Sequence, residues 1–291
     1  RIHAAGGLAS GPGSSRLQSQ GFPADVGLTR VCARHKPSGK AIFYRPMIPA
    51  PLGTTRTTVR SLYALITPDS HVPSKEPAWP KTTAFVLVSA GMGARLTVTL
   101  YIVAADGRGA GPTHGDEHFY YVVEGACEVN GQNLGAGGFA YIPAGGTFDI
   151  TSKSGARVLL FAKKYEALPG VAAPEPIFGD EKQVKSEPFL GDPAAQLQAL
   201  LPDRPEFDMA VNIFTYDPGG TLPFVECHIM EHGMFILEGA GVYKLGEDWH
   251  PVASGDALWL APYCPQWFVA MGKTRARYIY YKDVNRAPRL G

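Results

Sequence analysis

An internal repeat constrains the fold of this chain more than any other feature of its sequence. Three short apolar blocks occur twice, in the same order. The matched pairs are residues 121–126 (YVVEGA) and 235–240 (FILEGA), 138–143 (GFAYIP) and 256–262 (DALWLAP), and 156–161 (ARVLLF) and 276–281 (ARYIYY). Because self-similar blocks in one order mark repeated structural units, we expect two copies of a single fold.

The repeated unit has the pattern of β-structure. From Leu62 onward, runs of Val, Ile, Leu, Tyr and Phe alternate with Gly, Pro, Asn and Asp at close intervals, as expected for antiparallel strands joined by tight turns. The 291 residues include 34 Gly and 25 Pro, and only 18% are charged, which disfavours a helical bundle or a coiled coil. Ala194–Leu201 is the clearest helical candidate, and it is short.

The order of turns within each copy resembles a known family. In the second copy an apolar run ends in Glu238-Gly239, Gly255-Asp256 follows, and a further apolar run ends at Pro262. This order is similar to that of the cupins, which are small jelly-roll barrels. The resemblance implies an all-β bicupin, with two jelly-roll β-barrel domains in tandem.

The repeat also divides the chain. We expect a leader and N-terminal extension over 1–60, partly disordered because it is rich in Gly, Ser, Arg and Ala without a hydrophobic period. The first copy then occupies 61–167 and the second 206–291. The Pro- and Ala-rich stretch 168–205 is expected to be a linker between them.

Charge and cysteine content narrow the class of partner. A net charge of +1, without a basic run, argues against nucleic acid and against a membrane surface, and leaves a small molecule. Residues 83–105 are mostly apolar, but Arg95 interrupts them and a Gly-Met-Gly turn breaks them, which favours two strands and a turn over a membrane span. The four cysteines lack CxxC spacing, so they suggest neither a zinc ribbon nor a disulfide scaffold.

A cluster of metal-ligand residue types lies just before the Glu-Gly block of the second copy. On an extended strand Glu226 and His228 point to one face, and His232 shares their parity. Gln266 follows on a later strand, where cupins place their last ligand. We therefore predict a metal site made of Glu226, His228, His232 and Gln266.

The donor types restrict the ion without fixing it. Two imidazoles and one carboxylate with vacant positions are typical of non-haem Fe(II), whereas additional oxygen ligands favour Mn(II). Cys227 alternates with its neighbours and should face away, so ions that prefer thiolate are disfavoured.

The first copy serves as an internal comparison for the second. Aligning the Glu-Gly blocks places Pro112 opposite Glu226, His114 opposite His228 and His118 opposite His232, while Thr147 falls opposite Gln266. The first copy thus lacks both oxygen ligands, and we expect its metal site to be degenerate.

The same alignment picks out candidate substrate contacts. Tyr278 and Lys282 stand where the first copy has Val158 and Ala162. Tyr278, Tyr280 and Lys282 share strand parity, so on an inward face Lys282 would offer a cation to a substrate carboxylate and Tyr278 a hydroxyl. Tyr243, after the Gly239–Gly241 turn, is a further candidate at the same mouth.

The second half resembles one family much more specifically. The segments that carry the resemblance lie in both copies and extend it over about residues 60–288. They are residues 64–72, 232–243, 255–262, 265–267 and 272–286. These motifs are similar to those of the (S)-ureidoglycine aminohydrolase family, plant and bacterial bicupins of ureide breakdown.

The resemblance implies a hydrolase that removes ammonia from (S)-ureidoglycine to give (S)-ureidoglycolate, in purine and allantoin catabolism. It implies Mn(II) held by Glu226, His228, His232 and Gln266. It further implies substrate contacts from Glu226, Gln266, Tyr278 and Lys282, with Tyr243 near the pocket. Family members form homo-oligomers, and plant members enter the endoplasmic reticulum, although the leader before Leu62 departs from the family.

A mechanism follows as a hypothesis from the resemblance. The metal and Lys282 would fix the substrate, and Glu226 would relay a proton as well as bind the metal. Two alternatives stay open at this point, namely an Fe(II) cupin dioxygenase and a storage-like or sugar-binding bicupin without turnover. The second alternative has no need of Gln266 or Lys282.

Overall fold

Strands make up nearly all of the regular structure. The protein is described over residues 55–286, in a computed structural model. Within this range there are twenty strands and three short 3-10 turns, Pro68–Ser70, Ala90–Met92 and Glu181–Gln183. The predicted all-β class is therefore confirmed. Most of the predicted leader 1–60 lies outside the described residues, which also end before 287.

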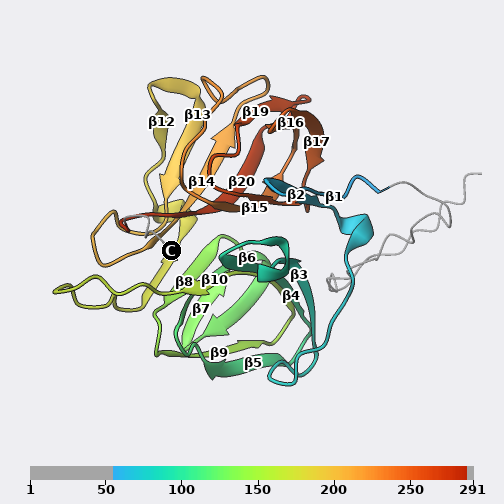
Figure 1. The fold of residues 1–291 in the computed structure, drawn as a ribbon. Helices are drawn as coiled ribbons and strands as arrows, with labels where there is room; N and C mark the ends of the chain where they lie inside the picture. Colours follow the sequence, from blue (N-terminus) through green and yellow to red (C-terminus); the bar gives the residue numbers. More distant parts are fainter. Residues whose placement is uncertain (1–54, 287–291) are drawn as a thin grey trace, which may run out of the picture. The chain divides into compact units, whose positions relative to one another are not determined.

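The first lobe is a sandwich of antiparallel strands, drawn in green in Figure 1. One sheet has the order β11-β8-β6-β10-β4-β3, and β5, β9 and the far part of β6 with β7 close over it. Its strands are β3 (Thr82–Val88), β4 (Leu96–Val103), β5 (Gly107–Pro112), β6 (Asp116–Val129), β7 (Gln132–Gly135), β8 (Gly138–Ile142), β9 (Thr147–Ser152), β10 (Ala156–Lys164) and β11 (Ile177–Asp180).

The second lobe repeats this design. An eight-stranded sheet of order β1-β2-β18-β15-β20-β14-β13-β12 faces a three-stranded sheet of order β17-β16-β19. Its strands are β1 (Thr58–Val59), β2 (Tyr63–Ile66), β12 (Glu187–Phe189), β13 (Asp192–Ala199), β14 (Met209–Tyr216), β15 (His232–Glu238), β16 (Ala240–Leu245), β17 (Asp248–Ala253), β18 (Ala257–Leu260), β19 (Gln266–Met271) and β20 (Ala276–Asp283).

Strand pairing reproduces the sequence alignment of the two copies. Pro112 pairs with Thr147 in the first lobe, and Glu226 forms a bridge with Gln266 in the second. On the neighbouring strands His118 pairs with Ala162, as His232 pairs with Lys282. The residues matched in sequence therefore occupy equivalent positions in the two lobes.

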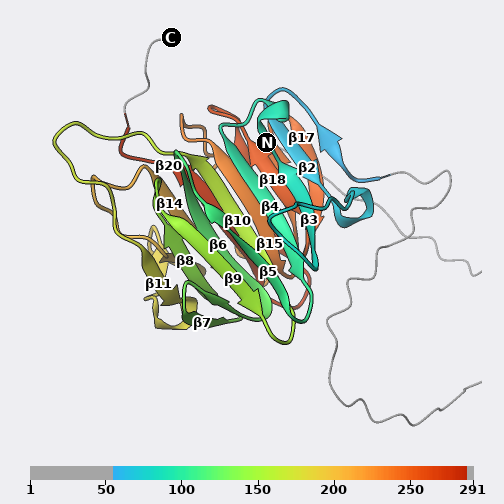
Figure 2. The same cartoon turned by 90° about the horizontal axis from the view of Figure 1, so that it is seen from below.

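One hairpin belongs to the lobe that is distant in sequence. β1 and β2 precede the first lobe in the chain, yet β2 pairs antiparallel with β18, with Tyr63 opposite Leu260 and Ile66 opposite Ala257. Figures 1 and 2 show this blue hairpin lying beside the orange and red strands of the second lobe. The second lobe is therefore completed by residues that come before the first.

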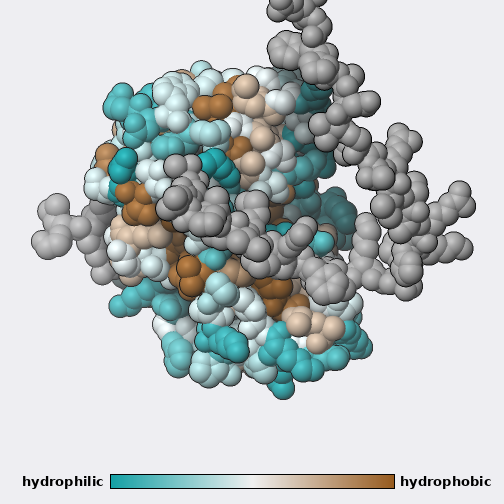
Figure 3. Space-filling view, turned by 90° about the vertical axis from the view of Figure 1, so that its right-hand side faces the viewer, coloured by the Kyte–Doolittle hydropathy of each residue, from teal (hydrophilic) through white to brown (hydrophobic). Residues whose placement is uncertain are grey.

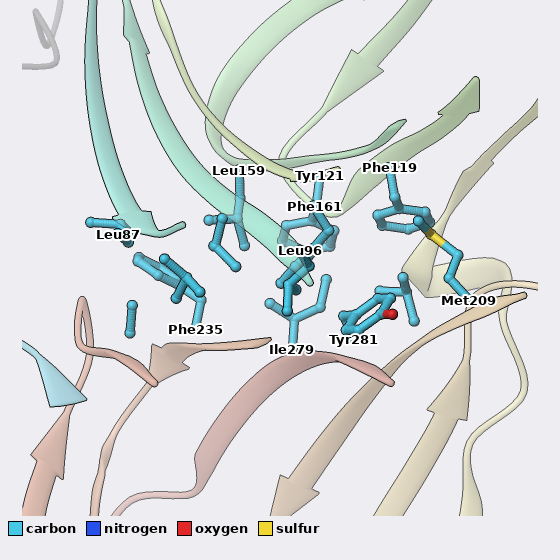
Figure 4. Close-up of a cluster of buried hydrophobic side chains, with 14 of the residues drawn as sticks. Leu87, Leu96, Phe119, Tyr121, Leu159, Phe161, Met209, Phe235, Ile279 and Tyr281 are labelled. Carbon is cyan, nitrogen blue, oxygen red and sulfur yellow. The ribbon is translucent and has the colours of Figure 1, made fainter. Parts of the chain in front are cut away.

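A shared core joins the two lobes. Each lobe has its own interior cluster of buried side chains, and a third cluster combines residues of both. In Figure 4, Phe119, Leu159 and Phe161 of the first lobe meet Phe235, Ile279 and Tyr281 of the second. Each fully buried side chain of this size contributes roughly 1.5–3 kcal/mol, so the interface is a hydrophobic core in its own right.

Gly233 shows how closely the sheets approach each other. A Cβ atom at this position would lie 2.5 Å from Leu96 Cδ1 and 2.9 Å from Val98 Cγ2. Only the absence of a side chain allows β4 of the first lobe to pack on β15 at this point. The contact falls one residue after His232, so the interface lies directly behind the candidate site.

Three local expectations can be compared with the structure. The helix predicted at Ala194–Leu201 is wrong, because 192–199 form β13 between β12 and β14, where sheet pairing outweighs a modest helix propensity. The two strands and a turn predicted within 83–105 are confirmed by β3, a 3-10 turn and β4. The stretch 168–205, expected to be a linker, contains β11, β12 and β13.

The surface of the described part is mixed in character. Figure 3 shows brown hydrophobic residues interspersed with teal hydrophilic ones on the face that it draws. Between residues 55 and 286 no helix has the length and apolar character needed to cross a membrane.

Candidate metal-binding site

The interior of the second lobe holds a pocket of about 130 Å³. All seven predicted site residues line it. The full lining consists of Phe189, Leu197, Phe214, Glu226, His228, Met230, His232, Met234, Tyr243, Gln266, Tyr278, Tyr280 and Lys282. Residues separated by more than fifty positions in the sequence are thus brought to one cavity.

Glu226 and His228 reach the pocket from a loop, not from the extended strand that the sequence suggested. The loop joins β14 to β15, and β15 begins only at His232. Two backbone hydrogen bonds tie Glu226 to Gln266, with N–O distances of 2.8 and 2.9 Å. The amide of Tyr263 donates to the carbonyl of His228 at 2.7 Å. Glu226 and His228 still reach the same pocket as His232, because the loop runs beside β19 as an irregular additional strand.

His232 is buried and its ring orientation is fixed. Its Nδ1 lies 3.0 Å from the carbonyl oxygen of Tyr281. Because that oxygen only accepts hydrogen bonds, Nδ1 carries the proton and Nε2 presents a lone pair. Burial lowers the pKa of His232 to about 3. The imidazole is therefore a neutral ligand aimed at the pocket.

The other donors gather around this nitrogen. His228 Nε2 lies 3.4 Å from His232 Nε2 and 3.1 Å from the amide of Gln266. The Gln266 oxygen accepts from Tyr243 Oη at 3.1 Å. Which end of the Gln266 amide faces the imidazoles is an assignment, and turning it over presents the oxygen to them.

Glu226 is the fourth residue of the predicted donor set and lies slightly further away than the others. Its Oε2 lies 3.9 Å from His228 Nε2, and its side chain is 21% exposed. Burial raises the pKa of Glu226, while the charges of His228 and Lys282 oppose that rise. The carboxyl therefore accepts a proton more readily than an ordinary glutamate does.

These distances test whether the donor set suits a metal ion. Ligands about 2.0–2.2 Å from an ion lie roughly 3 Å apart when adjacent and about 4 Å apart when opposite. The contacts of 3.1, 3.4 and 3.9 Å fall in this range. His228 Nδ1 is also buried without a hydrogen-bond partner. Two nitrogens and two oxygens suit Mn(II) or Fe(II).

The set is not complete as it stands. Among residues 55–286, no three side chains of His, Cys, Asp or Glu form a group that could hold a metal ion. The 3.9 Å contact of Glu226 is the longest within the set, and Gln266 is a donor outside those four residue types. The donors fit an ion once the Glu226 carboxylate moves inward and the Gln266 oxygen faces the imidazoles.

The predicted substrate contacts surround these donors. Lys282 on β20 pairs with His232 on β15, so both lie at the same level of the sheet. Tyr243 and Tyr278 are almost completely buried, and burial raises the pKa of both phenols. Tyr278 Oη is 3.1 Å from Tyr216 Oη. These tyrosines act as neutral hydroxyl groups.

Sequence reasoning missed most of the apolar wall. The pocket is also lined by Phe189, Leu197, Phe214, Met230 and Met234. Met234 shares strand parity with His232, and that signal was available. Phe189 and Leu197 lie in the stretch expected to be a linker, where no signal marked them.

Cys227 lies outside the lining, as predicted. It is exposed, and its Sγ donates to the carbonyl of Tyr263 at 3.3 Å. His250 also lies elsewhere, with Nε2 at 3.1 Å from Tyr63 Oη.

Comparisons with known proteins show the family of this chain. Residues 212–281 match the family described as Cupin domain. A probable (S)-ureidoglycine aminohydrolase of Oryza sativa subsp. japonica is 36% identical over 243 residues, which are 81% of this chain and 77% of the relative. The (S)-ureidoglycine aminohydrolase of Arabidopsis thaliana is 35% identical over 81% of this chain and 80% of its own length. The chain belongs to the (S)-ureidoglycine aminohydrolase family.

A solved structure supports the fold of this family member. The putative glyoxylate-induced protein of Pseudomonas aeruginosa superposes with a TM-score of 0.76 at 30% identity, covering 88% of this chain and 99% of that one. The predicted family and the predicted cupin fold are confirmed.

Proposed function

We propose that this protein hydrolyses (S)-ureidoglycine to (S)-ureidoglycolate and ammonia, with Mn(II) bound in the second lobe, as a step of purine and allantoin catabolism. Family membership supports the reaction class. The single observation that carries the proposal to this chain is the pocket of the second lobe, where His228 Nε2 lies 3.4 Å from His232 Nε2 and 3.1 Å from the amide of Gln266, beside Glu226 and Lys282.

The substrate offers three groups on one carbon, namely a carboxylate, an amine and a ureido group. The pocket holds a matching set of contacts. Lys282 supplies an ammonium for the carboxylate, and the hydroxyls of Tyr243 and Tyr278 offer hydrogen bonds to the polar remainder. Holding three substituents at once selects one enantiomer.

The residues that would hold the ion are Glu226, His228, His232 and Gln266. Bound Mn(II) supplies a positive centre that fixes and polarises the substrate. Phe189, Phe214, Met230 and Met234 provide the apolar wall of the pocket. That wall limits the access of bulk water and so strengthens every charged contact inside.

Glu226 is the proposed proton carrier of the reaction. The bond from the central carbon to the amine breaks, helped by electron release from the ureido nitrogen, and a bond from that carbon to a water oxygen forms. Glu226 accepts a proton from the water and delivers it to the departing ammonia. Because burial raises its pKa, this carboxyl exchanges protons closer to neutral pH than an exposed one.

The two lobes have different roles in this proposal. Residues 206–291, completed by β1, β2, β12 and β13, form the catalytic cupin, and the remainder of 61–167 forms a cupin whose metal site is degenerate. The first lobe lacks counterparts of Glu226, Gln266 and Lys282 and has Pro112, Thr147 and Ala162 instead. By family resemblance, the chain assembles as a homo-oligomer.

The test is ammonia release above the spontaneous rate. The Mn(II)-loaded protein is mixed with freshly generated (S)-ureidoglycine, and ammonia and ureidoglycolate are followed against a blank. We expect release well above the blank and loss of it after chelation. A rate equal to the blank would refute the proposal. Oxygen uptake by the Fe(II)-loaded protein, with no ammonia release, would instead indicate a dioxygenase, which the two imidazoles and one carboxylate also permit.

A further inference from the structure

Two site residues lie where their strands end. His232 is the first residue of β15, and Lys282 is the last but one of β20. They pair with each other at this end of the ladder. Strand ends open more readily than strand centres, yet a ligand set needs its members held to within about 0.5 Å. Some additional restraint is expected at this position.

The first lobe supplies that restraint through Arg95. The backbone N–H of Arg95 donates to Glu231 Oε1 at 3.0 Å, and its Nε donates to Glu231 Oε2 at 3.2 Å. Its Nη2 donates to Asp283 Oδ2 at 2.9 Å. The loop before β4 therefore forms hydrogen bonds with Glu231, which precedes His232, and with Asp283, which follows Lys282.

A backbone hydrogen bond also joins Glu231 to Asp283. The backbone N–H of Glu231 donates to Asp283 Oδ1 at 2.5 Å. Trp259 Nε1, on the neighbouring strand β18, donates to Glu231 Oε1 at 2.6 Å. These hydrogen bonds thus hold together the ends of β15 and β20 on the side away from the pocket.

We propose that Arg95 is a positioning residue for the metal and substrate site, contributed by the lobe that lacks a complete donor set. Side chains alternate along a strand, so Glu231 and Asp283 point to the lobe interface while His232 and Lys282 point into the pocket. Arg95 touches neither the pocket nor its contents, and acts by holding the two strand ends in register. The catalytic part of this role rests on the proposed function.

The expected effect on geometry can be measured separately from an effect on global stability. The Arg95 side chain is 57% exposed, whereas Glu231 is 1% exposed. The ion pair of Arg95 with Asp283, which is 24% exposed, contributes little to stability, whereas loss of the cation beside the buried Glu231 lowers it. If the guanidinium is removed, Glu231 keeps the Trp259 N–H and the Arg95 backbone N–H. The protein should therefore fold without the Arg95 side chain, while the strand ends lose the link through the guanidinium and keep the bond from the Glu231 N–H to Asp283.

A matching cluster lies behind the equivalent positions of the first lobe, with Lys163 and Asp208 in place of Asp283 and Arg95. Glu117 precedes His118 as Glu231 precedes His232, and it accepts from Tyr141 Oη at 2.6 Å. Lys163 follows Ala162 as Asp283 follows Lys282. Its Nζ binds Asp208 Oδ2 at 2.6 Å, and Asp208 precedes β14 as Arg95 precedes β4. This cluster lies behind positions without a complete donor set, so it offers a control in the same protein.

The experiment compares three full-length variants with the wild type. Arg95→Met removes the guanidinium, Arg95→Lys keeps the charge, and the double variant Lys163→Met/Asp208→Asn removes both charges of the matching pair together. Backbone amide exchange at residues 229–233 and 281–284 is measured, together with Mn(II) affinity and kcat/KM.

We expect Arg95→Met to speed amide exchange at both segments at least tenfold and to weaken Mn(II) binding by roughly 10–100-fold, as loss of supporting contacts does elsewhere. The midpoint of thermal unfolding should fall, so exchange and affinity are measured at a temperature where the variant is fully folded. Arg95→Lys should recover part of both losses. The double variant should leave the exchange of residues 229–233 and Mn(II) affinity unchanged; residues 281–284 are not compared in it, because the N–H of Val284 donates to the Asp208 carbonyl.

Wild-type exchange and wild-type Mn(II) affinity in Arg95→Met would overturn the proposal, as would equal losses in the double variant. If Arg95→Met fails to fold, Asp283→Asn is measured instead. It keeps an acceptor for the Glu231 N–H and loses the charge that binds Arg95, and unchanged exchange there would also overturn the proposal. If no variant or wild type releases ammonia while exchange and Mn(II) affinity respond to Arg95, the proposed function fails and the positioning role stands.

Discussion

The two lobes place a histidine at the same point of the same strand and make opposite use of it. His232 turns its Nε2 toward His228 and lies beside Lys282. His118 instead shares a hydrogen bond with Tyr120 Oη at 2.9 Å and lies beside Ala162. A conserved backbone register therefore does not by itself make a metal site; the neighbouring side chains decide.

The interiors differ in the same way. In the first lobe Trp79 stacks on Tyr101 with ring centroids 4.0 Å apart and packs against Phe148. A Cβ atom on Gly109 would lie 2.1 Å from the Trp79 ring, so that glycine makes room for it. His114, opposite His228, is exposed in a left-handed turn with φ of 54°. Aromatic packing fills the space that is a pocket in the second lobe.

The largest expected effect comes from changing Glu226, which has no equivalent carboxylate in the first lobe. Glu226→Gln removes an anionic ligand and the proposed proton carrier, so kcat should fall on the order of 10³-fold and Mn(II) affinity should fall with it. Steady-state ammonia release and metal titration measure both. Pro112→Ala, the equivalent change in the first lobe, should alter neither, and full activity in Glu226→Gln would break the comparison.

The next effect tests whether the first interior serves packing. Trp79 is 4% exposed, so Trp79→Ala should lower the free energy of unfolding by about 3–5 kcal/mol. At a temperature where the variant is folded, kcat should match the wild type. Urea unfolding gives the first quantity. A loss of kcat at equal folded fraction would show that the first interior takes part in catalysis.

A pH effect follows from the histidine of the first lobe. Burial lowers the pKa of His118 to about 4, below its ordinary value of about 6.5. The unfolded chain therefore binds more protons in this range, and stability present above pH 6.5 is lost as the pH falls toward 4. His118→Phe should reduce that loss by roughly 2–3 kcal/mol. Urea titrations of both metal-free proteins at pH 7 and 4.5 measure it, and parallel pH profiles would contradict it.

The smallest effect concerns Lys282, whose ammonium group is the proposed contact for the substrate carboxylate. Lys282→Met removes one charge-assisted hydrogen bond, so kcat/KM should fall about 10–100-fold, mainly through KM. Lys164→Met, a nearby change outside the pocket lining, is the control. Mn(II) affinity should be unchanged, because Lys282 is not a ligand in the proposal. An unchanged KM would remove Lys282 from the substrate contacts.

Much of the fold could be predicted because each repeated block is a short continuous stretch of the sequence. Matched blocks and Glu-Gly turns predicted equivalent strands, and the pairing of Pro112 with Thr147 and Glu226 with Gln266 agrees with that alignment. The pairing of β2 with β18 could not be predicted in this way. It joins residues about 190 positions apart, and no periodicity encodes a partner so distant.

The site was predictable where residue chemistry is distinctive and unpredictable where only shape matters. Glu226, His228 and Lys282 are conspicuous at their spacing, and all three line the pocket. Phe189 is an ordinary apolar residue that matters because β12 lies at the edge of the sheet beside the pocket. Arg95 carried a different signal, a charge within an apolar run, and its partners became visible only when the lobes were seen in contact.

The pairing of the β1–β2 hairpin with the second lobe has a consequence for synthesis of the chain. Ile66 of β2 pairs with Ala257 of β18. At about 5–20 residues per second, a ribosome needs roughly 10–40 s to reach the second partner after making the first. Throughout that interval the emerging first lobe grows while β2 waits without its partner strand. The second lobe can close only after β18 has been made, so its completion follows the synthesis of nearly all of the first lobe.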